Sequence, residues 1–478
     1  MKIKAFATRL AALLLAGILV LPCVGCAGEN EPLDTTDTAA DETVTEAETE
    51  YKPDIEVKNY DADFNVFVNC QDVDMLYREE TSGDLLGAAI YERGVNLREH
   101  LGVQLVMHNI GDWIAYADDI IKTVQAGDDD YQLVASTHTY QGIAQLLTAN
   151  ALQDIGELES VNLKAPYWST ELMEALSING QYLLGYSEFL INELHCLVFN
   201  KEMMETYNLE EPYGLVRSKE WTMDKLAQMA SNVAVDDGDQ KWTHKDTYGL
   251  TGWGWTYLVN FVTSSDMQIV KQDSDGCYKI AYDESSEKMI NLIDRTVALY
   301  GEEYTYFWPS TGGTGINFMD GTSLFQFYNT KALPTLRDAT FRFGVVPYPL
   351  YDEQQEDYKS LYWGGYMCVP GAIRNPEMVG DVLELLAYYS APVTTAYYED
   401  LLGAKLSEAP DDAEMLEIIW ASQTSDLGLV LCNCAPEMDA LVYLLPNMCE
   451  NPRNQYSSYL KKYTRSAQRG LDKIFGQS

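Results

Sequence analysis

Basic residues, histidines and long apolar runs are scarce in this chain. Its 478 residues include 32 Lys and Arg against 73 Asp and Glu, with five His, which gives a formal net charge of −41. A surface this acidic is repelled by nucleic acid and by anionic lipid headgroups, so we expect neither as a partner. No apolar run after residue 21 reaches the roughly 20 residues that a membrane-spanning helix requires.

The chain also lacks the short motifs of common enzyme classes. It contains no HExxH, no GxSxG and no phosphate-binding loop, and its histidines are dispersed. A glycosidase pair can always be imagined among so many carboxylates, so their abundance does not indicate one. The sequence therefore favours a binding protein without a cofactor, and a glycosidase is the alternative.

The N-terminus is typical of an export signal. Basic residues at positions 2, 4 and 9 precede an uncharged apolar run at residues 10–21, which is too short to span a bilayer. VGC at residues 24–26 resembles a lipoprotein processing site, which implies cleavage after Gly25 and acylation of Cys26. Ordinary signal cleavage near this point is the alternative.

A strongly acidic segment follows the signal. Residues 27–50 hold nine acidic side chains, six threonines and no basic residue. Such a segment repels itself and buries too little apolar surface to fold, so we expect an extended tether. A tether of this kind suits a receptor that is anchored to a membrane through lipid alone.

Seven cysteines follow residue 26, so at least one thiol stays unpaired. They are scattered, mostly inside apolar runs such as HCLVF and YMCVP, which favours small buried hydrophobes over a disulfide framework. Cys432 or Cys434 could still pair with Cys449. A metal site at CNC is the alternative, but no second cluster of Cys or His supports it, so we expect no metal.

The first part of the chain alternates strands and helices. We predict strands at residues 64–69, 103–108 and 132–136, with helices at 84–100, 113–126 and from 141 onward. Units of about 30 residues indicate right-handed crossovers and a parallel sheet with helices on both faces. Ligands of such sheets bind beyond the carboxyl ends of the strands.

The chain is organised around residues 315–370. GINFMDG at 315–321 ends an element on a glycine, and an apolar run at 324–328 predicts a buried strand. Two helical turns at 331–338 precede a strand, FRFGVVPYPL at 341–350, which prolines stop. Asn375 and Pro376 are the expected N-cap and first residue of the next helix.

This order of elements resembles the extracellular solute-binding proteins of ATP-driven importers, in the carbohydrate-binding group. FGVVPYP, the first crossing at residues 183–200, and FNKEMMETYNL after it each resemble family segments. Trp221 and Thr222 recur in the family at a helix start. Residues 391–408 and 411–428 resemble its C-terminal signature, whose helix we expect to end at Asp426 and Gly428.

The resemblance implies an α/β fold with two lobes of the periplasmic-binding-protein-like type II, joined by crossing segments at a hinge. The implied division is a signal peptide at 1–25 and a tether at 26–56, then lobe 1 at 57–193 plus 355–404 and lobe 2 at 194–354 plus 405–478. The implied protein is a monomer on the outer face of the cytoplasmic membrane, extracellular or periplasmic. It closes on a sugar and delivers it to ABC transporter permease subunits; a surface polysaccharide-binding protein without a transporter is the alternative.

Candidate ligand contacts lie where the predicted strands end. In the first lobe these are Asp72, Asp112, Trp113, His138 and Tyr140, although STHTYQ at 136–141 could equally be a helix cap with a surface tyrosine. By the family's pattern Glu193 in the first crossing meets ligand hydroxyls; a solvated charge is the alternative.

The second lobe offers an aromatic segment, YGLTGWGWTYLV. Gly252 and Gly254 let the backbone approach something flat, and the indoles of Trp253 and Trp255 can stack on a pyranose ring. Side chains two apart in a strand share a face, so we expect both tryptophans to be exposed as a platform; two core tryptophans are the alternative. Further expected contacts are Tyr328, Asn329, Trp363, Gly364, Gly365 and Tyr366.

Overall fold

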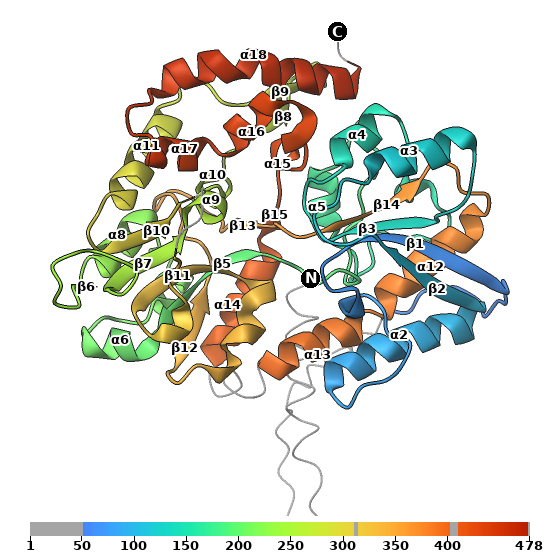
Figure 1. Cartoon of the computed structure of the whole chain (residues 1–478), viewed down its shortest axis with the longest axis horizontal. Coiled ribbons are helices and arrows are strands. Elements are labelled where there is room, and N and C mark those ends of the chain that lie inside the picture. The colour runs from blue at the N-terminus through green and yellow to red at the C-terminus, as the bar shows by residue number, and fades with distance from the viewer. Residues whose placement is uncertain (1–50, 310–313, 402–409, 477–478) are drawn as a thin grey trace, which may run out of the picture. The chain divides into compact units, whose positions relative to one another are not determined.

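The computed structural model describes residues 51–309, 314–401 and 410–476 (Figure 1). Pro53–Ser478 forms one compact unit, and the account below concerns that unit. Cys26, the signal and the tether up to residue 50 lie outside the described residues. Among the described helices, none combines the length and the apolar character needed to cross a bilayer.

The first sheet has the strand order β2-β1-β3-β14-β4. β1 pairs in parallel with both β2 and β3, which confirms the predicted parallel core, whereas β14 is antiparallel to β3 and to β4. The strands are β1 (Ala62–Asn69), β2 (Val103–Asn109), β3 (Leu133–Ser136), β4 (Leu152–Gln153) and β14 (Tyr366–Pro370).

Helices cover this sheet, and α12 and α13 pack against α2 (Figure 1). The helix expected from Trp113 starts four residues later, at Ala117, because Trp113 has φ +55°, outside the helical region. The helices are α2 (Leu85–Leu101), α3 (Ala117–Ala126), α4 (Ile143–Thr148), α5 (Thr170–Ala175), α12 (Pro376–Tyr388) and α13 (Ala391–Leu401).

The second sheet has the strand order β10-β7-β11-β5-β12, and β6 pairs with β7. β10, β7 and β11 are parallel, while β5 is antiparallel to β11 and β12, so β5 begins at the edge where β7, β10 and β11 end. The strands are β5 (His195–Asn200), β6 (Ala234–Val235), β7 (Thr247–Trp253), β10 (Thr305–Trp308), β11 (Ser323–Asn329) and β12 (Phe343–Val346).

The helices of the second sheet bury an aromatic core. Trp221 is completely buried and its indole nitrogen donates to the carbonyl oxygen of Pro347 (2.9 Å), while Thr222 caps α8 as predicted. Ser286 caps α11 by accepting from the backbone of Met289. The helices are α6 (Lys201–Thr206), α7 (Tyr213–Arg217), α8 (Met223–Ala230), α9 (Gly254–Tyr257), α10 (Asn260–Ser264), α11 (Glu287–Tyr300) and α14 (Pro410–Ala421), with the 3-10 helix η4 (Thr330–Asp338) after β11.

Three chain segments cross between the two sheets and are bonded to one another. β13 (Ser360–Leu361) pairs in parallel with β15 (Gln423–Thr424), at the centre of Figure 1. Leu194 forms a bridge with Tyr362, and the backbone of Tyr362 donates to Thr424 (2.7 Å). The crossing segments expected at the hinge are therefore present, while the residue limits proposed for the lobes stay a prediction.

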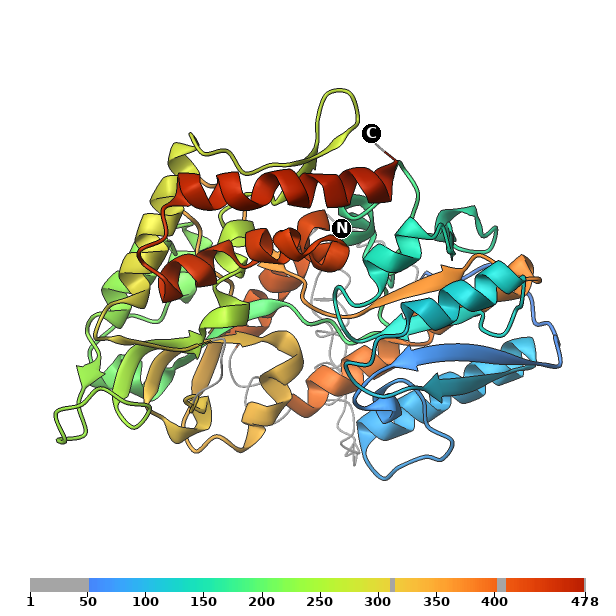
Figure 2. The same ribbon diagram turned by 45° about the horizontal axis from the view of Figure 1, so that its top comes forward.

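A C-terminal helical layer follows the last crossing. α18 lies over α16 and beside hairpin β8–β9 (Figure 2). The Gln468 side chain of α18 accepts from the N–H of Ile280 and donates to the carbonyl oxygen of Tyr278, both in β9. Asp426 does not end the preceding helix as predicted: α14 ends at Ala421, and Asp426 caps α15 through the N–H of Gly428. The elements are β8 (Val270–Gln272), β9 (Tyr278–Ile280), α15 (Leu427–Val430), α16 (Pro436–Val442), α17 (Leu444–Glu450) and α18 (Tyr456–Phe475).

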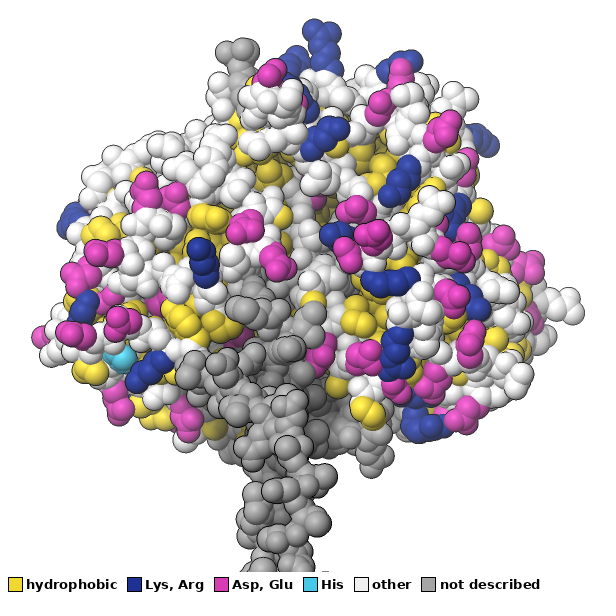
Figure 3. Space-filling model, turned by 180° about the vertical axis from the view of Figure 1, so that it is seen from behind, with side chains coloured by type: hydrophobic (Ala, Val, Ile, Leu, Met, Phe, Trp, Pro, Cys, Tyr) yellow, Lys and Arg dark blue, Asp and Glu magenta, His cyan; other side chains and the backbone are white. Residues whose placement is uncertain are grey.

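Charge and thiols are distributed as the composition suggests. Acidic side chains spread across the face seen in Figure 3, with basic ones interspersed. The seven described cysteines are all free, and five of them are buried, which confirms their prediction as small core residues. Cys449 therefore pairs with neither Cys432 nor Cys434.

Candidate functional site

The loops after β1, β2 and β3 leave the same edge of the first sheet, because these strands are parallel. They bring together four of the predicted residues: Asp112 and Trp113 after β2, and His138 and Tyr140 after β3. We call these four residues the strand-exit cluster. Asp72, after β1, is exposed and precedes a short 3-10 helix without capping it.

Trp113 is the most exposed member of this cluster, with 59% of its surface accessible. Its ring lies 3.9 Å from that of His138 at an angle of 35°, and 6.4 Å from that of Tyr140. Its φ of +55° is an outlier for a bulky residue, a conformation that persists only where the surroundings hold it. The indole is thus held out into solvent by a constrained loop.

His138 supports the indole as a neutral ring. Its Nε2 lies 2.6 Å from Oδ1 of Asp112. Burial lowers the pKa of His138, and the neighbouring Asp112 carboxylate only partly opposes this shift. An uncharged imidazole therefore lies against the Trp113 ring at neutral pH.

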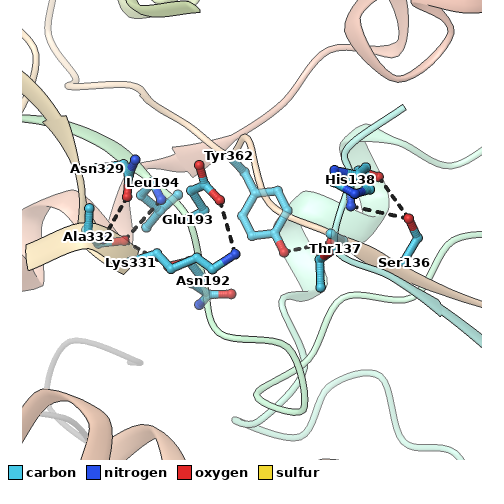
Figure 4. A network of polar contacts seen from close by, with 12 residues as sticks. Ser136, Thr137, His138, Asn192, Glu193, Leu194, Asn329, Lys331, Ala332 and Tyr362 are labelled. Carbon is cyan, nitrogen blue, oxygen red and sulfur yellow. Dashed lines mark hydrogen bonds and ion pairs between the residues drawn. The ribbon is translucent and has the colours of Figure 1, made fainter. Parts of the chain in front are cut away.

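Glu193 and Lys331 face the first sheet from the second (Figure 4). Lys331 Nζ lies 3.6 Å from Glu193 Oε2, and Tyr362 stands between this pair and the loop that carries His138. Burial raises the pKa of Glu193, and the charge of Lys331 opposes that rise. The predicted carboxylate is thus part of an ion pair, and Lys331 adds a cation that the sequence had not indicated.

Tyr443, between α16 and α17, joins the two sides through aromatic contacts. Its ring stacks on Trp255 at 4.1 Å and 10°, and meets Trp363 edge-on at 6.5 Å. The hydroxyls of Tyr443 and of Tyr140, in the strand-exit cluster, are also near enough to affect each other's pKa. No local pattern marks Tyr443 as a site residue, so only the tertiary structure could find it.

His195, the first residue of β5, is completely buried behind these rings. It stacks on Trp363 at 5.4 Å and 16°, and lies 4.9 Å from Tyr257. Neither ring nitrogen has a hydrogen-bond partner among the described residues. Burial lowers the pKa of His195 to about 3, so the ring is neutral.

The predicted two-tryptophan platform takes a different form. Trp253 ends β7 and is 38% exposed, whereas Trp255 lies on helix α9, so the two side chains do not share one strand face. The expected common strand face was wrong because Gly254 starts a helix, while a ligand contact of either indole stays a prediction. The flat group that Gly252 admits is the ring of Phe327, which a Cβ at position 252 would approach to 2.8 Å.

Tyr328 and Asn329 end β11, at the edge of the second sheet where β7 and β10 also end. The Tyr328 hydroxyl lies 2.8 Å from Oγ1 of Thr335. The Asn329 side chain accepts from the backbone of Ala332, which caps η4, and donates to the Tyr257 hydroxyl (3.2 Å).

The stretch after β13 is largely buried. Gly364 and Gly365 are buried, and a Cβ at Gly365 would lie 2.0 Å from the carbonyl oxygen of Ser136. Tyr366 is completely buried, with its hydroxyl bonded to the carbonyl oxygen of Gln141. These residues support the loop of His138 and Tyr140 from behind, while Trp363 remains partly exposed.

Residues 95–404, more than half of the chain, match the family model of the bacterial extracellular solute-binding proteins. The chain belongs to this family. Comparison with curated proteins gives no significant match. The two-lobed α/β fold of type II predicted from the sequence is the fold of this solute-binding protein.

Solved structures agree on the fold. One is an ABC substrate-binding protein of Listeria monocytogenes in complex with cycloalternan, with a TM-score of 0.56 and 11% identity over 87% of this chain and 100% of that one. Another is CpMnBP1 with mannotriose bound, with a TM-score of 0.52 and 14% identity over 86% of this chain and 100% of that one. At these identities the likeness concerns the fold of this solute-binding protein alone.

Proposed function

We propose that this protein captures a carbohydrate, a sugar or oligosaccharide, by closing its lobes on it, and delivers it to an ABC transporter. The exposed Trp113 indole carries the proposal, because aromatic faces stack on the apolar faces of pyranose rings. The two solved structures of similar fold each hold a saccharide, cycloalternan or mannotriose, which supports the same ligand class.

Polar groups around the indole suit a hydroxyl-rich ligand. Asp112 and Glu193 offer carboxylate oxygens and Lys331 offers an ammonium group, from opposite sheets. A sugar that lacks one hydroxyl would leave its buried partner unpaired, which is how such a site discriminates between sugars. Both carboxylates of this set are already paired, Asp112 with His138 and Glu193 with Lys331, so we propose binding without turnover.

The remaining parts of the proposal concern location. Acylation at Cys26 would tether a monomer to the outer face of the cytoplasmic membrane, and the acidic segment would give it reach. The closed receptor would then dock on the permease subunits, whose ATPase supplies the energy. Labelling with a fatty-acid analogue, compared between the native chain and Cys26→Ala, tests the anchor.

Binding is tested by the melting temperature of the protein from Pro53 onward with mono- and oligosaccharides, and with amino acids and peptides as controls. A ligand at about 100 times its dissociation constant adds roughly 2.7 kcal/mol, which means a few degrees. A shift with saccharides and no product by chromatography would support a receptor. Turnover would support a glycosidase, and shifts with peptides alone would contradict the ligand class.

Trp113→Ala tests the site itself. We expect affinity to fall about tenfold, which corresponds to about 1.4 kcal/mol, with little change in the melting temperature of the ligand-free protein. The control is Trp242→Ala, because Trp242 is 40% exposed but lies in the second lobe before β7, where its ring contacts that of Tyr248 at 5.6 Å. Equal affinities for the two variants would remove Trp113 from the site.

A further inference from the structure

Asn69 ends β1 and is completely buried, yet its side chain serves a neighbouring loop. Its Nδ2 donates to the carbonyl oxygens of Gly111 (2.8 Å) and Ile114 (3.2 Å). These two carbonyls bracket Asp112 and Trp113. One amide group therefore ties both ends of the four-residue segment that carries the exposed indole.

Backbone bonds and a second amide hold the same loop from β2. The N–H of Ile110 donates to the carbonyl oxygen of Val68 (3.0 Å), which continues the pairing of β1 with β2. Asn109 accepts from the N–H of Gly111 (3.1 Å), and Gly111 has φ +100°. The entrance of the loop is thus fixed by the sheet, while Ile114, its exit, depends on Asn69.

The loop needs this tie because its conformation is unfavourable by itself. A tryptophan with left-handed φ returns to ordinary backbone regions unless surrounding bonds prevent it. His138 offers a face for the indole and accepts a long hydrogen bond from the backbone N–H of Trp113 (3.4 Å). The bonds of Asn69 to the carbonyls of Gly111 and Ile114 restrain the backbone on both sides of Trp113.

We propose that Asn69 is a positioning residue for ligand binding: its amide holds the loop at residues 111–114 in the conformation that presents Trp113. This inference rests on the proposed role of Trp113 as the sugar platform. If only a fraction of molecules has the loop in place, the apparent affinity falls by that fraction. Asn69 then acts on affinity through Trp113 without touching the ligand.

The test uses Asn69→Asp, which keeps the shape of the side chain and removes its two donated bonds. The matched control is Gln132→Glu, because Gln132 is 4% exposed and its Nε2 also donates to two oxygens, both of Asp129. Gln132 precedes β3, at the opposite end of the same sheet. Both variants lose a buried amide, so a general loss of stability affects both.

Two readouts are compared. The first needs no ligand: the ¹⁹F resonance of 5-fluorotryptophan at position 113, assigned with Trp113→Phe, reports the setting of the ring. The second is the affinity for mannotriose, for cycloalternan and for any saccharide that shifts the melting temperature. Both are measured for Asn69→Asp, Trp113→Ala and the double variant.

We expect Asn69→Asp to move or broaden the Trp113 resonance and to weaken affinity about tenfold, with no further loss in the Trp113→Ala background. Gln132→Glu should change neither readout. A Trp113 resonance that is unchanged in Asn69→Asp overturns the inference even if Trp113→Ala binds weakly. The inference is also overturned if Asn69→Asp weakens affinity by the full tenfold in the Trp113→Ala background. Unchanged affinity in Trp113→Ala overturns instead the role of Trp113, and with it any role of Asn69 in binding.

Discussion

Acid should weaken this fold through His195. The ring is completely buried without a hydrogen-bond partner among the described residues, and its pKa is lowered from 6.5 to about 3. Below pH 6.5 the unfolded chain takes up a proton that the folded chain refuses until about pH 3. The stability that neutral His195 contributes is therefore present above pH 6.5 and is lost as the pH falls.

The size of this loss follows from linkage. Between pH 6.5 and 5 the unfolded state gains about 1.36 kcal/mol per pH unit, so His195 removes about 2 kcal/mol from the free energy of unfolding. Asp426 acts in the opposite direction, because burial raises its pKa to about 6. Below pH 6 the folded state takes up a proton on Asp426, which adds about 1.4 kcal/mol to the free energy of unfolding by pH 5. This gain would hide most of the loss caused by His195 in the native protein.

A comparison with His195→Phe separates the pH dependence caused by His195 from that caused by Asp426. The phenyl ring can keep the stacking on Trp363 and the tilted contact with Tyr257, and it has no nitrogen to titrate. Urea denaturation at pH 7 and pH 5 should show that the native protein loses about 2 kcal/mol more than the variant between the two values. Equal losses in the two proteins would refute the assignment of a neutral, unpartnered His195.

Two further predictions concern packing and charge. Gly365→Ala should destabilise the protein by about 1–3 kcal/mol or more, because its Cβ would meet the carbonyl oxygen of Ser136. The control, Gly214→Ala, places its Cβ in open space on α7 and should be neutral or stabilising by up to about 1 kcal/mol. Similar melting temperatures for the two variants would contradict this. Asp412→Asn should lower the free energy of unfolding, measured by urea denaturation, by about 3–5 kcal/mol. The reason is that Lys201 Nζ lies 3.0 Å from the buried Asp412 carboxylate and would lose its charged partner. A loss below about 1 kcal/mol would show that Lys201 finds another partner.

Local patterns predicted the fold where the deciding contact lies a few residues away. Asn375 caps α12 by accepting from the N–H of Met378, with Pro376 as first residue, as predicted. The strand–helix alternation of the first lobe likewise needed only its own periodicity. These elements were predictable because propensity and capping act within one helical turn.

The site depended on contacts that the local sequence does not contain. The start of α3 was predicted at Trp113 because nothing nearby shows that Asn69, more than forty positions earlier, holds this residue in a left-handed conformation. Tyr443 meets Trp255 only after the C-terminal layer has packed. Residue types at strand ends could thus be named in advance, but not which rings would touch.

The position of β14 has a consequence for the order in which the protein can fold during export. Every strand of the second sheet lies within residues 195–346, so that sheet can close as one continuous piece. The first sheet cannot, because β14 lies between β3 and β4 and starts at Tyr366, about 230 residues after β3 ends. At about 5–20 residues per second, its central gap stays open for roughly 10–50 s after β3 has been made. The sheet whose first strands emerge earliest is therefore completed last, so the edge of β3 stays unpaired throughout this interval.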